Sequence, residues 1–301
     1  MIISENYNGI IGVNKPEGWT SFDVIAKLRG ILRIKRLGHA GTLDPMATGV
    51  LPVFVGKATK ACDIIPDVKK VYLAGFKFGV STDTEDVTGK VLSSSDKAVS
   101  SSDIEDCIEK FTGDIMQVPP MYSAVKVGGK KLYELARAGK VVDRQPRKIH
   151  IDSITVSEYN EETREGKIII DCEKGTYVRT VISDMGNALG CGGIMTSLVR
   201  TYSGGIDISK CYTLDEINDI CQQDRLSEIL IPCDKPFEIY PSVKLTERIT
   251  KLYKNGVKLR PQQVGFDNAE DGIFRVYGFD NEFIGTGYFK DNEFRCHKNL
   301  C

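Results

Sequence analysis

Short apolar runs of strand length alternate with amphipathic helical patterns along this chain, and that alternation limits its fold more than any other feature. Runs typical of buried strands occur at residues 9–13, 51–55 and 71–78. The first run ends at a turn, Lys15-Pro16-Glu17-Gly18, and helical spacing begins directly after it. The sequence therefore predicts a globular protein that contains both strands and helices, and it carries no internal repeat.

Capping residues and glycines mark the ends of the expected helices. Thr20 or Ser21 can cap the first helix, and Thr213 with Glu216 has the spacing of a capping box. The apolar face of the first helix comprises Phe22, Ile25, Leu28 and Leu32. Glycines at 113, 139 and 190 end three further helices, expected at residues 104–111, 131–138 and 178–189.

The second half of the chain predicts a strand pair and a separate terminal module. Residues 149–156 and 167–171 have the pattern of paired strands joined by a polar turn, whereas the serine-rich residues 93–103 predict an exposed loop. The composition changes at residues 232–241. After this point we expect a module of about 60 residues, with a helix at 247–255 capped by Thr246 and strands at 273–279 and 283–289.

Cysteine and histidine usage argues against disulfides and metal. The nine cysteines form no CxxC pair, which indicates reduced thiols in a cytoplasmic protein. The three histidines are far apart, so we expect no metal site. We also expect no export signal and no membrane span, because the first residues lack a basic segment and no apolar run approaches about 18 residues.

Charge is sorted into blocks although the net charge is only −1. Residues 15–60 carry eight Lys or Arg against three acids, and residues 122–148 carry eight against two. Residues 81–116 between them carry nine acids against three lysines. The blocks indicate one basic and one acidic face, and either basic block alone is also compatible with an ordinary solvated surface.

The stretch GHAGTLDPMATG, residues 38–49, holds a single acid, Asp44, in a glycine-rich loop. Pro45 biases Asp44 toward extended torsions, and the three glycines permit conformations that other residues avoid. The loop thus presents Asp44 from a constrained backbone between basic surfaces. The residue types alone favour an aspartate that bonds its own turn, and the glycines and the basic blocks weaken this interpretation without excluding it.

Two motif interpretations of nearby stretches fail. Gly56-Lys57-Ala58 lacks the spacing and the hydroxyl of a phosphate-binding P-loop. The acidic run at 82–86 lacks the spaced ligands of a calcium loop, so we expect a solvated turn there.

Five blocks, in order along residues 9 to about 205, resemble the TruB family of tRNA pseudouridine synthases. The first two are KPEGWTS at 15–21 and the loop GHAGTLDPMATGVLPV at 38–53. The third joins Lys70-Val71-Tyr72 to the turn at 79–86. The fourth covers VPPMYSAVK at 118–126 with GKKLY at 129–133, and the fifth covers KGTYVRT at 174–180 with Leu198 and Arg200.

The resemblance implies an α+β fold. It would be a pseudouridine synthase catalytic domain at 1–235, with a central mixed, mainly antiparallel sheet flanked by helices. An RNA-gripping insertion would occupy about 82–148, and a small, mostly β, PUA-like RNA-binding module would occupy 240–301.

The resemblance also implies an activity and a set of site residues. The enzyme would be an isomerase that flips uridine 55 out of the tRNA T-loop, breaks its N-glycosidic bond, turns the uracil and rejoins it through carbon. Asp44 would be the nucleophile, paired with Arg179, and Tyr72 would stack on the uracil and could take its C5 proton. Tyr177 and Leu198 would line the pocket, and the RNA would be bound by His39, Lys15, Lys126, Lys130 and Lys131.

No cofactor is expected, because the reaction involves neither redox change nor net hydrolysis. The expected partner is the T-stem-loop of tRNA, bound by a monomer that needs no protein partner. Three alternatives remain open at this point. They are an RNA-binding or tRNA-folding protein without catalysis, a hydrolase that uses Asp44, and a guide-RNA-dependent relative of the same family. Turnover on naked tRNA without a guide RNA distinguishes the synthase from the binding protein and from the guide-dependent relative. Release of free uracil would indicate the hydrolase.

Overall fold

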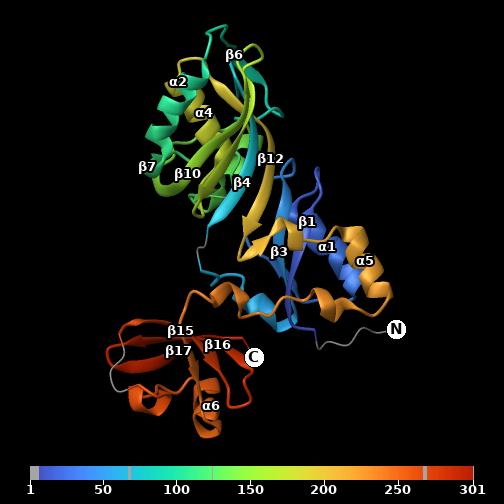
Figure 1. Cartoon of the computed structure of the whole chain (residues 1–301), viewed down its shortest axis with the longest axis vertical. Coiled ribbons are helices and arrows are strands. Elements are labelled where there is room, and N and C mark those ends of the chain that lie inside the picture. Colours follow the sequence, from blue (N-terminus) through green and yellow to red (C-terminus); the bar gives the residue numbers. More distant parts are fainter. Residues whose placement is uncertain (1–6, 67–68, 124, 267–269, 301) are drawn as a thin grey trace. The chain divides into compact units, whose positions relative to one another are not determined.

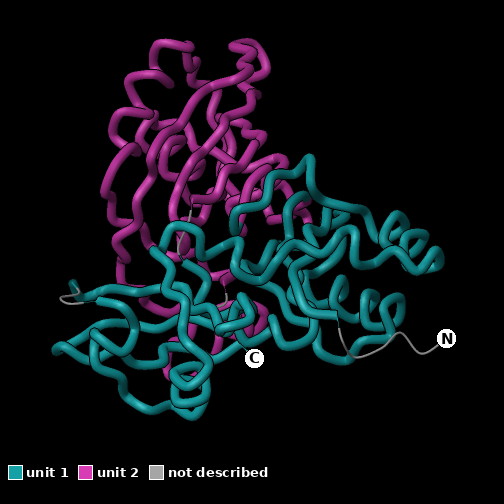
Figure 2. Tube along the Cα trace, turned by 60° about the horizontal axis from the view of Figure 1, so that its bottom comes forward, with its two compact units in different colours: residues 1–45, 49–66, 204–301 teal, residues 46–48, 67–203 magenta. Residues whose placement is uncertain are grey.

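The computed structural model describes residues 7–66, 69–123, 125–266 and 270–300. Ala124, in the fourth block, and Cys301 lie outside this part of the chain. The chain forms two compact units (Figure 2). Unit 1 comprises Met1–Pro45, Gly49–Pro66 and Gly204–Cys301, and unit 2 comprises Met46–Thr48 and Asp67–Ser203. Unit 1 therefore combines the two ends of the sequence, and unit 2 is almost entirely the middle.

The first part of unit 1 is a small antiparallel sheet with one helix. Its elements are β1 (Gly9–Lys15), α1 (Ser21–Leu32), β2 (Leu37–His39), β3 (Thr48–Val55) and the 3₁₀ helix η1 (Gly56–Ala61). β1 pairs with β3 over its whole length, from Gly9 opposite Val55 to Lys15 opposite Gly49. β2 pairs with β3 as well, so β3 is hydrogen-bonded to both β1 and β2.

Helix α1 begins as the sequence predicts and buries a slightly different face. Thr20 caps it in a capping box with Asp23. The prediction that Phe22 belongs to the buried face is wrong, because Phe22 is 64% exposed. Ser21 occupies the buried position instead, where its hydroxyl bonds Leu43. The buried face comprises Ser21, Val24, Ile25, Leu28 and Leu32.

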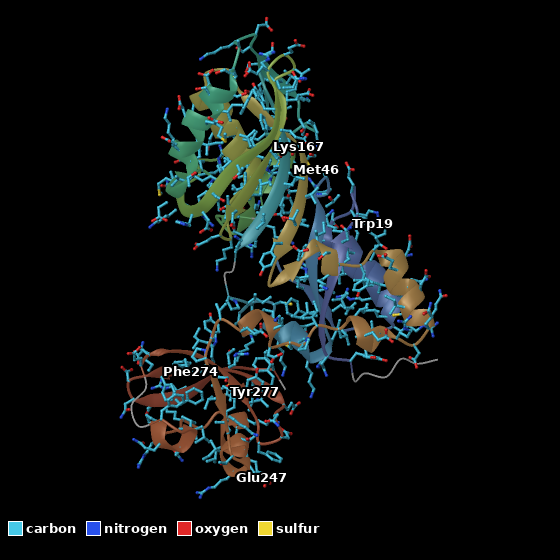
Figure 3. The ribbon with its side chains drawn as sticks, viewed as in Figure 1. Trp19, Met46, Lys167, Glu247, Phe274 and Tyr277 are labelled. Carbon is cyan, nitrogen blue, oxygen red and sulfur yellow. The ribbon has the colours of Figure 1, made fainter. Side chains whose placement is uncertain are left out.

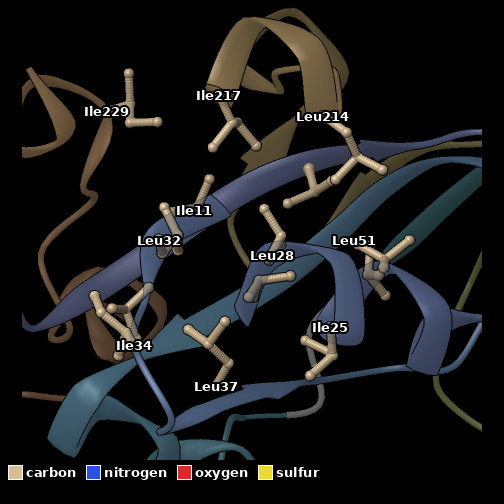
Figure 4. Packing of buried hydrophobic residues seen from close by; sticks show 14 of the residues in the cluster. Ile11, Ile25, Leu28, Leu32, Ile34, Leu37, Leu51, Leu214, Ile217 and Ile229 are labelled. Carbon is tan, nitrogen blue, oxygen red and sulfur yellow. The ribbon is translucent and has the colours of Figure 1, made fainter. Parts of the chain in front are cut away.

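The rest of the N-terminal core comes from residues that follow unit 2 in the sequence. They form β13 (Ile206–Asp207), η3 (Ile208–Lys210), α5 (Leu214–Gln222), η4 (Leu226–Ile229) and η5 (Lys235–Phe237). The predicted capping box of Thr213 and Glu216 is confirmed at the start of α5. Leu214 and Ile217 of α5 pack with Leu28 of α1 and Leu51 of β3 in one apolar cluster (Figure 4).

The C-terminal module of unit 1 is a four-stranded sheet with one helix. Its elements are β14 (Ser242–Lys244), α6 (Glu247–Lys254), η6 (Pro261–Val264), β15 (Gly272–Tyr277), β16 (Phe283–Lys290) and β17 (Glu293–Asn299). The strand order is β14-β15-β16-β17, with β14 parallel to β15 and the other pairs antiparallel. The two predicted strands are confirmed. Thr246 stands at the cap position, but its side chain makes no capping bond.

Aromatic residues fill the core of this module. The rings of Phe266, Phe274 and Phe289 meet edge to face in each pair, with centroids 5.2–5.4 Å apart. Phe274 and Tyr277 both project from β15 (Figure 3). The Tyr277 hydroxyl donates to Asp234 at 2.6 Å, which ties the module to the segment that leads into it.

The module also contacts the first part of unit 1 through its last residues. Lys298 forms an ion pair with Asp63 at 2.9 Å, just after η1. Leu300 is buried in a cluster that includes Phe54 of β3 and Phe237 of η5. The two ends of the chain therefore share one apolar cluster within unit 1.

Unit 2 is built on five antiparallel strands in the order β12-β4-β11-β10-β7. These are β12 (Gly193–Ser203), β4 (Lys70–Phe78), β11 (Glu165–Cys172), β10 (Arg147–Asn160) and β7 (Gly113–Gln117). The predicted pairing of 149–156 with 167–171 is confirmed by the β10–β11 hairpin. The smaller elements are β5 (Val80–Thr82), β6 (Val91–Ser94), α2 (Ser101–Ile108), η2 (Glu109–Phe111), β8 (Lys126–Val127), β9 (Lys130–Lys131), α3 (Leu132–Arg137) and α4 (Val178–Ala188).

The helices of unit 2 follow the predicted pattern with local differences. α4 packs against β12, and α2 packs against α4 (Figure 1). α2 begins inside the predicted serine-rich loop, because Ser100 caps it in a box with Asp103. In the described part of the chain no helix is long and apolar enough to cross a membrane. The eight cysteines that the structure describes form no disulfide bond.

The α1 core gives a direct test of this fold. Leu28 is fully buried, so Leu28→Ala removes packed atoms and leaves a cavity. We expect the free energy of unfolding to fall by about 2–5 kcal/mol. Phe22→Ala, on the exposed side of the same helix, should change it by less than about 0.5 kcal/mol. Urea titration measures both, and equal losses would contradict the observed helix orientation.

Candidate active site

Asp44 lies in the loop that joins β2 to β3, and its side chain is half-buried. His39 ends β2, opposite Val53 of β3, and is also half-buried. Gly41 and Gly49 have positive φ angles of 70° and 96°, as the glycine-rich sequence predicts. The loop is therefore constrained at both ends by conformations that favour glycine.

Both residues that flank Asp44 are bonded to residues 15–21, Leu43 to the first residue of α1 and Pro45 to the turn before it. The main-chain amide of Leu43 donates to the Ser21 hydroxyl at 3.0 Å. The Pro45 carbonyl accepts from the Gly18 amide at 2.8 Å and from Lys15 Nζ at 3.2 Å. These bonds fix the backbone on either side of Asp44 and so restrict where its carboxylate can point.

Lys15 has a different role from the predicted one. Its side chain is 0% exposed, and Nζ donates to the carbonyls of Pro16 at 2.9 Å, of Trp19, and of Pro45 at 3.2 Å. A buried ammonium group cannot reach an RNA phosphate, so the prediction that Lys15 binds RNA is corrected. Lys15 instead ties the turn at 15–19 to the Asp44 loop.

Tyr72 and Leu198 lie on the same face of the unit 2 sheet. Tyr72 of β4 stands opposite Arg200 of β12, and Leu198 stands opposite Ala74. Directly opposed residues of antiparallel strands project from the same face, and so do residues two apart on one strand. All three of Tyr72, Leu198 and Arg200 are buried. The two predicted pocket residues are thus neighbours across the β4–β12 pair.

A basic pair accompanies Tyr72 on this face. Lys70 is two residues before Tyr72 on β4, and Arg200 is directly across from Tyr72. Burial, together with the charge of Arg200, lowers the pKa of Lys70. The surroundings of Tyr72 are therefore cationic as well as apolar.

Arg179 lies in the first turn of α4 and is 6% exposed. Its guanidinium lies 3.7 Å from a carboxylate oxygen of Asp86, and it also donates to the Tyr122 carbonyl. Asp86 is itself buried, and its other oxygen accepts from the hydroxyls of Thr84 and Thr88 and from the Thr88 amide. Both groups of this ion pair are thus removed from water.

The turn at 82–88 is therefore not the solvated turn that the sequence predicts. Asp86 pairs with Arg179, and neighbouring Glu85 accepts from the hydroxyl of Thr180. Burial raises the pKa of Glu85, while the bond from Thr180 and the charge of Arg179 act in the opposite direction. Asp86 is a site residue that reasoning from the sequence missed, because its acidic and hydroxyl neighbours are typical of exposed turns.

Tyr177 precedes α4 as its N-cap residue, but its side chain makes no capping bond. The three lysines predicted to bind RNA lie on a small hairpin, β8–β9, that precedes α3 in the sequence. Lys126 and Lys130 are exposed, whereas Lys131 is half-buried, with Nζ 3.3 Å from the Tyr133 hydroxyl. Gly128 and Gly129, with φ angles of 58° and 83°, form the tip between β8 and β9. The hairpin therefore presents two lysines to solvent.

The predicted residues divide between the two units. Lys15, His39 and Asp44 belong to unit 1, and Tyr72, Tyr177, Arg179, Leu198 and the three hairpin lysines belong to unit 2. Within unit 2, Arg179 is paired with Asp86. The pairing of Asp44 with Arg179 stays a prediction.

Lys15→Met tests the link between the first turn and the Asp44 loop. The substitution keeps an unbranched side chain and removes the donor for three carbonyl groups. We expect the free energy of unfolding to fall by about 1–3 kcal/mol, measured by urea titration. Lys27→Met, on the exposed side of α1, is the matched control. Equal unfolding midpoints for the two variants would show that the Lys15 bonds contribute nothing.

Two family models match the chain in succession. "TruB family pseudouridylate synthase (N terminal domain)" matches residues 29–178, and "tRNA pseudouridylate synthase B C-terminal domain" matches residues 179–238. Among solved structures, an H/ACA RNP bound to a substrate RNA containing 2′-deoxyuridine has a similar fold, with a TM-score of 0.74. It is 23% identical, and the match covers 97% of this chain and 85% of that one.

Bacterial relatives are similar over nearly their whole length. The tRNA pseudouridine synthase B of Clostridium kluyveri is 41% identical over 97% of this chain and 99% of its own. The protein of the same name from Staphylococcus saprophyticus is 43% identical, with 92% of both chains covered. The chain therefore belongs to the TruB family of pseudouridylate synthases.

Proposed function

We propose that this chain converts uridine 55 in the T-loop of tRNA to pseudouridine. The observation that carries the proposal is the Asp44 loop of a TruB family member, in which Leu43 is bonded to Ser21 at the start of α1 and Pro45 to the turn before it. Relatives that are 41–43% identical over at least 92% of this chain are named tRNA pseudouridine synthase B. The uridine 55 specificity is the one that the five sequence blocks imply.

The reaction is an isomerisation. The bond from C1′ of the ribose to N1 of uracil breaks, the base turns, and a bond from C1′ to C5 forms. The proton on C5 leaves and N1 gains one, so atoms and charge balance without an oxidant or reductant. In the proposed mechanism the Asp44 carboxylate is the nucleophile, attacking either the sugar or the base.

Arg179 is proposed to keep Asp44 ionised and oriented. A cation close to a carboxylate favours its charged form, and a planar guanidinium can bind two acceptors at once. The support for this role is that Arg179 is buried and already directed by Asp86 and the Tyr122 carbonyl. A guanidinium directed in this way loses little freedom when it binds a further carboxylate.

Tyr72 is proposed to stack on the flipped uracil and to accept the C5 proton. Tyr177 and Leu198 are proposed to line the same pocket. The support is that Tyr72 and Leu198 share one buried sheet face. The cations Lys70 and Arg200 beside Tyr72 would stabilise a phenolate formed there.

RNA binding is proposed for His39, Lys126, Lys130 and Lys131, and Lys15 is no longer included. Flipping a base out of a folded loop costs a few kcal/mol, which phosphate contacts would offset. The hairpin at 126–131 is a suitable source of such contacts because Lys126 and Lys130 are exposed. The module at 240–301 is proposed as a further RNA-binding element, beside a catalytic region at 1–235 with its insertion at about 82–148.

The enzyme is proposed to act as a monomer on naked tRNA, without guide RNA or protein partner. The likeness to the H/ACA RNP concerns the fold alone. Mapping pseudouridine in an unmodified tRNA transcript, incubated with the purified chain only, tests this point. Pseudouridine at position 55 supports the proposal, and product that forms only after a guide RNA is added contradicts it.

Asp44→Asn tests the nucleophile. We expect the variant to form no pseudouridine in a T-stem-loop RNA and to bind that RNA as the wild type does, because the amide keeps the shape and loses the nucleophilic carboxylate. Single-turnover assays and a binding titration measure the two properties. Asp63→Asn, a change at an exposed aspartate in the same unit, should retain full activity. Turnover by Asp44→Asn would refute the mechanism.

Replacing Lys126, Lys130 and Lys131 together with alanine tests the RNA-binding hairpin. We expect weaker tRNA binding and a salt dependence whose log–log slope is shallower by about two. The control replaces Lys77 and Lys167, which are already paired with Glu165 and Glu158 in the same unit. Fluorescence titrations at several salt concentrations give both slopes, and an unchanged slope in the triple variant would exclude the hairpin from phosphate binding.

A further inference from the structure

Gln117 is the last residue of β7, the outermost strand in the unit 2 order, and its side chain is only 2% exposed. Its amide group makes two hydrogen bonds to the main chain of one residue. Nε2 donates to the Tyr177 carbonyl at 3.1 Å, and the Tyr177 amide donates to Oε1 at 2.9 Å. The side chain thus binds Tyr177 in the way that a neighbouring strand would.

This contact lies at the start of α4. Tyr177 is the N-cap residue, in an extended conformation with φ −97° and ψ 103°, and its side chain provides no cap. Its carbonyl also accepts the first helical bond, from Val181 at 3.0 Å. Gln117 therefore fixes the peptide from which the helix begins, and the backbone there sets the direction of Arg179 two residues later.

The chain just after Gln117 reaches Arg179 as well. Tyr122, five residues further on, accepts a hydrogen bond from the Arg179 guanidinium through its carbonyl. A different segment contacts the same turn of α4, where Asp86 pairs with Arg179 and Glu85 with Thr180. The start of α4 is thus held by hydrogen bonds to Gln117 and Tyr122 on one segment, and by polar contacts with Glu85 and Asp86 on another.

We propose that Gln117 is a positioning residue for the isomerisation, which orients Tyr177 and Arg179 through the Tyr177 main chain. It does not touch substrate. This inference rests on the proposed function, because Tyr177 and Arg179 serve the reaction only if this chain catalyses it. Gln117 directly precedes the fourth sequence block and is not among the site residues that the resemblance implies.

Two variants at this position separate orientation from simple packing. Gln117→Met keeps the length of the side chain and removes both bonds. We expect kcat to fall between about ten- and a hundredfold at every pH, because a small displacement of reacting groups slows the reaction by this much. KM for tRNA should stay within about threefold of the wild-type value. Met116→Ala, at the exposed neighbouring position of β7, is the control and should retain both constants.

Gln117→Glu adds a pH readout. A protonated glutamic acid offers one donor and one acceptor, like the amide, whereas the carboxylate would place an acceptor against the Tyr177 carbonyl. Burial at this position should raise the pKa of the introduced acid above its usual value of about 4.3. We expect its kcat relative to wild type to recover as the pH falls from about 8 to 5.5, while the ratio for Gln117→Met stays flat.

The outcomes are distinct. A kcat for Gln117→Met within about twofold of wild type, a change confined to KM, or a flat pH ratio for Gln117→Glu would each overturn the proposal. If Gln117→Met does not fold, the pH dependence of the more conservative Gln117→Glu decides the question alone.

Hydrogen exchange at the Tyr177 amide separates this inference from the proposed function. Slow exchange in the wild type and faster exchange in Gln117→Met support the contact, and equal rates overturn it. Absence of pseudouridine with the wild-type chain would refute the proposed function instead, whatever the exchange rates.

Discussion

The buried ammonium group of Lys15 determines the conformation of the backbone beside Asp44. An ammonium removed from water needs several acceptors, and here the carbonyls of Pro16, Trp19 and Pro45 supply them. Because Pro45 follows Asp44 directly, the requirement of the lysine for acceptors fixes the loop beside the aspartate. The turn at 15–19 thus shapes a site that lies some thirty residues away in the sequence.

In unit 2 another buried cation, Arg179, also requires polar partners. Arg179 is buried and its charge is balanced by Asp86, whose remaining lone pairs are occupied by Thr84 and Thr88. Removing one partner of a buried pair leaves an uncompensated charge, so the arginine, the aspartate and the threonine-rich turn depend on one another. Gln117 adds two hydrogen bonds between uncharged groups at the N-terminus of the same helix. The described site residues therefore depend on buried polar contacts as much as on apolar packing.

Local signals in the sequence predicted local structure well. The cap of α1, the capping box of α5 and the β10–β11 hairpin follow from residues a few positions apart, and all are present. The glycine-rich composition of the 38–49 loop likewise predicted its constrained backbone. The family itself followed from ordered motifs that no propensity argument supplies.

Features that depend on distant partners were not predictable. Phe22 has an apolar side chain, yet Ser21 is buried instead because Leu43 offers it a bond. Asp86 is buried because α4, almost a hundred residues further on, provides Arg179. The strand β17 was not predicted, because apolar and polar residues do not alternate regularly in its sequence, EFRCHKN. It forms a strand by pairing with β16.

The arrangement of unit 1 has a consequence for synthesis on the ribosome. The apolar cluster of α1 and β3 is completed by α5, which begins 159 residues after β3 ends, and the neighbouring cluster is completed by Leu300. At translation rates of about 5–20 residues per second, the first strands wait roughly 8–30 s for α5 to be made. Unit 2, by contrast, is nearly contiguous in sequence and can fold as soon as β12 emerges. The nascent chain therefore exposes its N-terminal apolar face while the middle folds, and this interval is when chaperone binding or aggregation would compete with folding.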